Sequence, residues 1–251
     1  FITAAMSECD LPNGACLRAP VTRSARHPSW VDGARSFDLQ AVEVDGLVGD
    51  EQVVPIGDSL ELVSLGTPLE FSGFGLSNNE AGVLVDLKTR LHSFSEVATL
   101  SPNGTEPNLN LAWAQSFDGP EGGMCSGDSG GPIYVGSGAD KRVVGVHSSG
   151  FCDRYGLGVL LAHLEPFVQA FISEQPLPAA TETCDTCTAR RLADNCASLA
   201  TECVDDEGCL VADTCFTLCP DQACRAQCLV GDPGAELLAE IVACGLEGCE
   251  E

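Results

Sequence analysis

Positive charge is scarce in this sequence. Lys and Arg together number 12 against 37 Asp and Glu, which gives a formal net charge of −25. A surface of this sign repels phosphate backbones, so nucleic acid is a poor candidate partner. Solubility in a harsh or extracellular medium is the simplest interpretation of the acidic surface, and a specific cationic partner is the alternative.

Long apolar runs are also missing. No stretch reaches the roughly 18 apolar residues of a membrane-spanning helix, so none is predicted. No signal peptide is evident, and the first residue is Phe1 rather than Met. We therefore expect the chain to be a piece of a longer one.

Cysteine, in contrast, is abundant and unevenly placed. Of 15 cysteines, only Cys9, Cys16, Cys125 and Cys152 precede residue 180, and the others crowd into 184–249. So many cysteines are atypical of a reducing cytosol, which predicts a secreted, cell-surface or periplasmic protein in an oxidising compartment. Cys9 and Cys16 flank a Pro-Asn-Gly turn and are expected to close a small loop of their own.

The cysteine-rich segment favours disulfides over metal. Cys184-x-x-Cys187 is a possible zinc ligand pair, but the segment lacks histidine and holds more thiolates than one zinc needs. Neither a metal nor a cofactor is expected. We expect at least four disulfides within 184–251 and one unpaired cysteine near the C-terminus, with Cys249 the first candidate. A cysteine just past Glu251 would complete the pairing.

The pattern of apolar, turn-forming and cysteine residues divides the chain into three parts. Residues 1–163 read as all-β, with short apolar stretches separated by turn residues, and residues 164–174 carry apolar side chains at helical spacing. A Pro-rich linker at 175–183 follows. Residues 184–251 are then expected to form a small helical module stapled by disulfides, with few contacts to the β part. The predicted strands lie at 52–56, 60–65, 82–87 and 143–146.

Residues 127–132, Gly-Asp-Ser-Gly-Gly-Pro, are the most specific signal. Flanking glycines let the backbone fold tightly, so the N–H groups of Gly127 and Ser129 can point at one spot beside the Ser129 hydroxyl. An acyl-transfer nucleophile needs such an oxyanion hole, because negative charge grows on the attacked carbonyl oxygen. A plain Gly-rich turn is the alternative, but one chosen hexapeptide arises by chance with a probability of only ~10⁻⁶ to 10⁻⁵ in a chain this long.

The hexapeptide and its surroundings resemble the chymotrypsin/trypsin family of serine proteases. The resemblance covers residues 1–174 and is strongest after residue 120. It rests on Cys125-Ser126, on Gly-Val-His-Ser-Ser-Gly at 145–150 with Cys152, on Leu-Gly-Val-Leu at 157–160, and on Phe-Ser-Gly-Phe-Gly at 71–75. His27-Pro28 with Phe37-Asp38-Leu39 is similar to the segment that carries the family's triad aspartate. The module at 184–251 resembles cysteine-rich modules of secreted myxobacterial proteins.

The resemblance implies a fold and a site. The fold is mainly β, two antiparallel Greek-key barrels with a cleft between them, the first barrel truncated at its N-terminus. It implies Ser129 as nucleophile, Asp38 as the aspartate that orients the base, and a Cys125–Cys152 disulfide. For the substrate pocket it implies a floor at Gly123 and Met124, one wall from Ser148 to Gly150, and Gly158 opposite. Gly123 replaces the aspartate of a trypsin, so a medium or large apolar side chain is expected in this pocket.

The general base departs from the family pattern. The family carries it as the histidine of Thr-Ala-Ala-His-Cys, whereas residues 3–7 here read Thr-Ala-Ala-Met-Ser, which places Met6 at the histidine position. A thioether cannot take the proton from Ser129. Among the four histidines, only His147 adjoins the pocket, and its side chain is expected to turn away from the cleft.

Three hypotheses on function stay open at this point. The first is a serine endopeptidase by descent, impaired by Met6, acting on peptide or protein through an acyl-enzyme at Ser129. It includes the possibility that Met6 is an altered position in an active protease. The second is a non-catalytic homologue, a secreted binding protein that keeps the cleft. The third assigns the function to the cysteine-rich module, which would dock to an envelope or a protein partner.

Overall fold

The computed structural model describes residues 20–31, 37–45, 53–57, 59–78, 84–85, 91–100, 110–116, 122–180, 187–188, 190–192, 195–219, 221–230, 233–247 and 249. The predictions for Met6, Cys9, Cys16 and Cys184 fall outside these residues.

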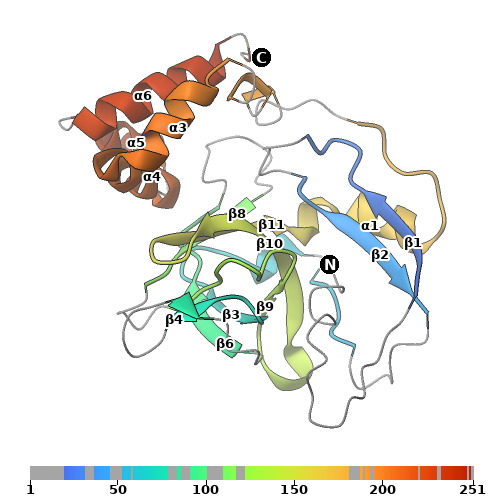
Figure 1. Cartoon of the computed structure of the whole chain (residues 1–251). Coiled ribbons are helices and arrows are strands. Elements are labelled where there is room, and N and C mark those ends of the chain that lie inside the picture. Colours follow the sequence, from blue (N-terminus) through green and yellow to red (C-terminus); the bar gives the residue numbers. More distant parts are fainter. Residues whose placement is uncertain are drawn as a thin grey trace.

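A seven-stranded antiparallel sheet forms the centre of the molecule (Figure 1). Its strands, in spatial order, are β6 (Leu91–Glu96), β3 (Pro68–Gly73), β9 (Pro132–Val135), β10 (Arg142–Phe151), β11 (Tyr155–Leu160), β8 (Asn110–Ala114) and β7 (Thr99–Leu100). The sheet curls back on itself, so that the Ser95 hydroxyl on the edge strand β6 donates to the Ala114 carbonyl on β8, the strand next to the opposite edge, at 2.7 Å. This half-barrel confirms the predicted mainly β, trypsin-type fold.

The inside of the curled sheet is packed with side chains from nearly every strand. Trp113, Phe71, Ile133 and Leu69 are each no more than 1% exposed. On β11 every residue is buried, although antiparallel strands commonly alternate buried and exposed positions. The reason is that the outer face of β11 is also covered, by a helix at one end of the strand and by the cysteine-rich part at the other.

A second, smaller β unit lies beside this sheet. It pairs β1 (Val21–Arg26) with β2 (Gln40–Val44), and α1 (Glu165–Ile172) packs on it. Phe37 and Leu39 share a buried cluster with Phe167 of α1 and Val159 of β11. The predicted helix at 164–174 is confirmed, since α1 begins and ends within two residues of it. Burial of its apolar face therefore ties the end of the β part to both β units.

Three of the predicted strands differ from the structure. Residues 60–65 begin with a short 3-10 turn, η3 (Leu60–Leu62), because the Ser59 hydroxyl accepts from the Glu61 N–H and caps it. The strand predicted at 52–56 is reduced to one bridge between Ile56 and Val143. At 82–87 the structure has the two-residue strand β5 (Leu84–Val85), which pairs with β4 (Ser77–Asn78). The stretch 143–146 lies within β10.

The cysteine-rich part folds as a bundle of short helices. They are α3 (Ala197–Asp205), α4 (Glu207–Leu218), α5 (Gln222–Cys228) and α6 (Pro233–Leu246). The carboxylates of Asp206 and Asp221 cap the N-termini of α4 and α5 by accepting from backbone N–H groups. Cys203, Cys209, Ala212, Ala235 and Leu238 are among the buried residues between the helices.

Disulfides join these helices to one another. The bonds are Cys187–Cys249, Cys196–Cys244, Cys203–Cys209, Cys215–Cys228 and Cys219–Cys224. The prediction of at least four is confirmed, but Cys249 as the unpaired cysteine is wrong. It bonds to Cys187 because α6 brings the end of the chain back beside the start of the module. Because its sulfur is in this disulfide, Cys187 cannot serve as a thiolate ligand for zinc.

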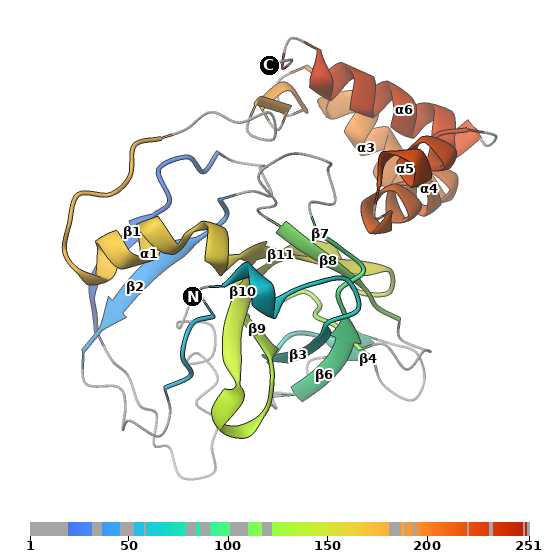
Figure 2. The ribbon, with the colours of Figure 1, turned by 180° about the vertical axis from the view of Figure 1, so that it is seen from behind.

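The helical bundle contacts the outer face of the sheet (Figure 2). Tyr155 Oη donates to Asp213 Oδ2 at 2.6 Å, and Arg154 Nη2 donates to Glu207 Oε1 at 2.6 Å. Leu218 of α4 packs against buried Tyr155 and Leu157. These contacts cover β11 at the end away from α1. In the part of the chain that is described, no helix is long and apolar enough to span a membrane.

Candidate active site

The loop that carries Ser129 is a tight turn between Cys125 and β9. The Asp128 N–H donates to the Cys125 carbonyl at 3.0 Å, and the Gly131 N–H donates to the Asp128 carbonyl at 2.8 Å. Gly127 and Gly130 have φ angles of +99° and +82°, a conformation that favours glycine. The turn leaves the Ser129 side chain exposed to solvent at its apex.

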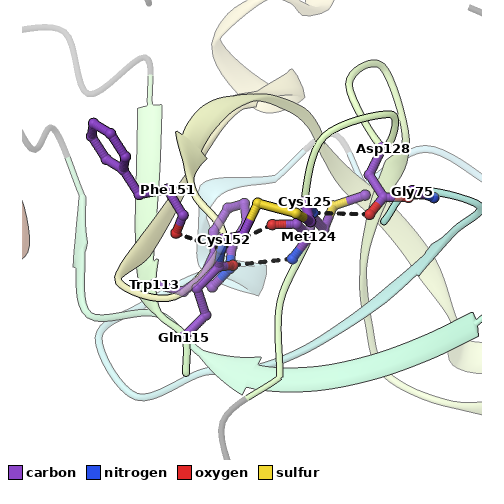
Figure 3. The surroundings of a disulfide bond; sticks show 8 residues. All are labelled: Gly75, Trp113, Gln115, Met124, Cys125, Asp128, Phe151 and Cys152. Atoms are coloured by element: carbon purple, nitrogen blue, oxygen red, sulfur yellow. Dashed lines mark hydrogen bonds between the residues drawn. A yellow bond between two sulfur atoms is a disulfide. The ribbon is translucent and has the colours of Figure 1, made fainter. Parts of the chain in front are cut away.

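The Asp128 carboxylate braces this turn from behind. It accepts from the Gly75 N–H at 2.7 Å and from the Cys125 N–H at 2.9 Å (Figure 3). It also lines a pocket of about 440 Å³ between β3, β6 and the loop at 122–125.

Two backbone donors flank the Ser129 side chain. The N–H groups of Asp128, Gly130 and Gly131 all donate to carbonyl oxygens. Among the described residues, by contrast, no acceptor pairs with the N–H of Gly127 or of Ser129. These are the two groups that the sequence assigned to the oxyanion hole, and both are available to an incoming oxygen.

Asp38 lies against the strand that adjoins the Ser129 turn. The Ser148 hydroxyl on β10 donates to Asp38 Oδ2 at 2.7 Å, across a sequence separation of 110 residues. One residue earlier, His147 holds the turn through its backbone, because Gly130 donates to its carbonyl at 2.9 Å and its own N–H donates to Gly131 at 2.8 Å. The structure thus brings Asp38 to the strand that holds the nucleophile loop.

The His147 side chain is buried rather than presented to Ser129. Its residue is 5% exposed and its ring lies 5.7 Å from the Trp113 ring, centroid to centroid. Burial lowers the pKa of His147 to about 4, against smaller upward effects of a hydrogen bond to the Leu157 backbone and of the Asp38 charge. The ring is therefore neutral at pH 7, and Nδ1 meets no hydrogen-bond partner within the described residues.

The other three histidines take part in packing, pairing or turns elsewhere in the fold. The His27 ring stacks on Phe37 at 4.7 Å and lies 5.0 Å from the Phe167 ring, so it packs α1 onto the smaller β unit. His92 pairs with Glu70 at 3.1 Å on the surface of β6. His163 ends the short turn η5 (Leu161–His163) that precedes α1.

The Cys125–Cys152 disulfide implied by the resemblance is present, with 4.6 Å between the Cα atoms. It joins the residue that opens the nucleophile turn to the end of β10. Met124, directly before it, is buried at 3% exposure, with its Cε methyl group beneath Gly131. In Figure 3 the Cys125–Cys152 disulfide lies in the middle, with Gln115 and Trp113 on one side of it and Asp128 on the other.

The residues expected to wall the pocket lie on two adjacent strands. In the β10–β11 ladder, Gly150 lies opposite Gly156, whereas Gly158 lies opposite His147. A bulge between His147 and Ser149 offsets the two strands. The next strand continues the row, since Gly156 lies opposite Trp113 of β8.

Sequence reasoning missed Trp113 and Gln115, which both lie in this region. Gln115 Oε1 accepts from Trp113 Nε1 at 2.9 Å and from the Met124 N–H at 3.0 Å. Its Nε2 donates to the carbonyls of Met124 and Phe151, each at 2.9 Å. The i, i+2 spacing of Trp113 and Gln115 on a strand, which puts both on one face, was the available signal.

The family assignment follows from a comparison of the whole sequence. The model of the family described as Trypsin matches residues 4–166, and the chain belongs to that family. No curated protein matches the sequence. A solved structure of a mutant of human heparin binding protein (CAP37) has a TM-score of 0.50 and 17% identity, covering 67% of this chain and 74% of its own. Mouse neuropsin, a serine protease, has a TM-score of 0.49 and 18% identity, covering 62% and 73%.

Proposed function

We propose that this chain carries a serine endopeptidase site with Ser129 as nucleophile. The observation that carries the proposal is the turn around Ser129, where the exposed serine is flanked by the N–H groups of Gly127 and Ser129, which have no acceptor among the described residues. Ser129 Oγ would attack the carbonyl carbon of a peptide bond, and the two N–H groups would stabilise the oxyanion that forms. The oxyanion then collapses, the C–N bond breaks and the amine leaves with a proton, after which water hydrolyses the acyl-enzyme to release the acid and free Ser129.

The proton of the Ser129 hydroxyl needs an acceptor. Asp38, held by Ser148, is the candidate to orient a base, and the resemblance puts that base at position 6. Met6 offers no basic atom, and the buried, neutral His147 packs on Trp113. Loss of the base costs a Ser-His-Asp enzyme about 10⁶-fold in kcat. We therefore propose that hydrolysis is arrested by Met6 while the rest of the site is retained.

Replacement of Met6 by His tests this proposal. We expect the Met6→His chain to hydrolyse peptide esters several orders of magnitude faster than the parent, because the proton path from Ser129 is restored. The double variant Met6→His/Ser129→Ala is the control and should return to background. A folded Met6→His protein without activity would refute the endopeptidase proposal.

A secreted binding protein is the second candidate. It is favoured by Met6 itself and by the burial of His147, which together leave an intact cleft without a base. In that case a peptide would bind beside Ser129 without cleavage. Strong peptide binding with no turnover in the Met6→His protein would support this candidate over the first.

A further inference from the structure

The row of residues behind the Ser129 turn determines which side chain can enter the site. Gly150, Gly156 and Trp113 lie directly opposite one another on β10, β11 and β8. Opposite residues of antiparallel strands project on the same face of the sheet. Two members of the row have no side chain, and the third has the largest one.

The indole of Trp113 fills the space that the glycines leave. A Cβ on Gly156 would overlap the indole, and a Cβ on Gly158 would come within 3.5 Å of it. Trp113 itself is 0% exposed. The indole is also wedged between the rings of Phe71, at 4.6 Å, and His147, at 5.7 Å, so it has no room to rotate away.

The predicted floor of the pocket is closed in the same way. A Cβ on Gly123 would overlap the Gln115 amide. This amide uses both of its ends in hydrogen bonds, to Trp113, to the backbone of Met124 and to the Phe151 carbonyl. Gln115 is 4% exposed, so it fixes the indole from below and is itself buried.

A substrate placed at Ser129 would direct one side chain toward this filled space. Its main chain can lie along residues 148–150, because β9 pairs with β10 only from Arg142 to Val146 in the described ladder. With the carbonyl oxygen at the N–H groups of Gly127 and Ser129, the side chain next to that carbonyl points between the 148–150 edge and the floor at 123–124. There it would meet the Trp113 indole, which lies against Gly156, and the Gln115 amide, which lies against Gly123.

We infer that Trp113 restricts this site to peptides with glycine or alanine on the acyl side of the bond at Ser129. The inference rests on the proposed function and deepens it. It reverses the expectation of a medium or large apolar side chain, which followed from the glycines alone. Trp113 is thus the specificity-determining residue, and Gln115 is the residue that positions its indole.

Binding of two peptide aldehydes tests the inference without requiring turnover. The aldehydes are identical except for alanine or phenylalanine next to the carbonyl, and each adds reversibly to the Ser129 hydroxyl. By calorimetry, the Met6→His protein, in which Ser129 has a base, should bind the alanine compound at least about tenfold more tightly than the phenylalanine compound. When Trp113→Leu or Trp113→Ala is added to that protein, the preference should fall or reverse, because the vacated volume admits a phenyl ring.

Two controls distinguish failure of this inference from failure of the proposed function. Trp30→Leu removes the other tryptophan, which packs in the cluster of Phe37 and Phe167 rather than in that of Trp113, and should leave the preference unchanged. Labelling of Ser129 in the Met6→His protein by a small dialkyl fluorophosphate reports on the nucleophile alone. Labelled protein that prefers the phenylalanine compound, or a folded Trp113→Leu protein with the parent's preference, overturns the inference and leaves the proposed function standing. Absence of both labelling and aldehyde binding overturns the two together.

Discussion

The Ser148 hydroxyl donates a hydrogen bond of 2.7 Å to Asp38 Oδ2 and thereby joins the smaller β unit to the strand beside the nucleophile turn. Asp38 follows Phe37, which packs on α1, and Ser148 follows His147, whose backbone holds Gly130 and Gly131. The bond therefore fixes the Asp38 carboxylate against the strand whose backbone holds the nucleophile turn.

Removal of the Ser148 hydroxyl should weaken the site. In the Met6→His protein, Ser148→Ala leaves Asp38 without this donor, and we expect kcat to fall by about tenfold while KM changes little, because the effect acts through the orientation of the base. Peptide ester kinetics measure this. Ser137→Ala is the matched control, since its exposed side chain makes no capping hydrogen bond, and it should behave as the parent. A larger rise in KM than fall in kcat would contradict the assignment.

The two kinds of disulfide should differ in their effect on stability. Replacement of Cys125 and Cys152 by Ala releases a loop of 27 residues and should lower the free energy of unfolding by about 3–4 kcal/mol. Replacement of Cys203 and Cys209 releases a loop of 6 residues and should cost about 2 kcal/mol. Urea unfolding followed by circular dichroism measures both. An equal loss of unfolding free energy in the two variants would show that loop length does not determine the contribution of these disulfides.

Stability should fall in mild acid through His147. Because the folded-state pKa of about 4 lies below the ordinary value of 6.5, the unfolded chain takes up the proton first as the pH falls. The stabilisation is complete above pH 6.5 and is lost progressively down to about pH 4, by up to about 3 kcal/mol.

The variant His147→Val isolates this contribution. It should flatten the pH dependence of the unfolding free energy between pH 6.5 and 4, and the remaining slope should include His27, whose pKa is also lowered by burial. Urea unfolding at intervals across this range is the measurement. An unchanged slope would mean that His147 is not protonated preferentially in the unfolded chain.

The contact between the helical bundle and the sheet should depend on Tyr155. Tyr155→Phe removes the donor to Asp213 and should lower the free energy of unfolding by about 1 kcal/mol. Glu207→Gln is the comparison, because its pair with Arg154 is largely exposed on the Glu207 side and is worth at most about 0.5 kcal/mol. The reverse order of effects would contradict the docking seen here.

Much of the fold and of the site followed from local sequence. The all-β texture, the helix at 164–174 and the disulfide-rich helices are properties of short-range spacing, which needs no knowledge of distant contacts. Gly127, Ser129 and Gly130 belong to one turn, so their arrangement is also a local matter. The carboxylate at Asp38 was found by its resemblance, and only the structure supplied its partner Ser148.

What the sequence by itself determined is the family, the nucleophile turn and the density of cysteines. The tertiary structure decided the register of β10 against β11 and the pairing of Cys187 with Cys249. It also decided what lies beside the glycines of these strands. A glycine in a sequence shows that a side chain is missing, but whether the space stays open depends on the neighbouring strand, where Trp113 lies opposite Gly156 and occupies it.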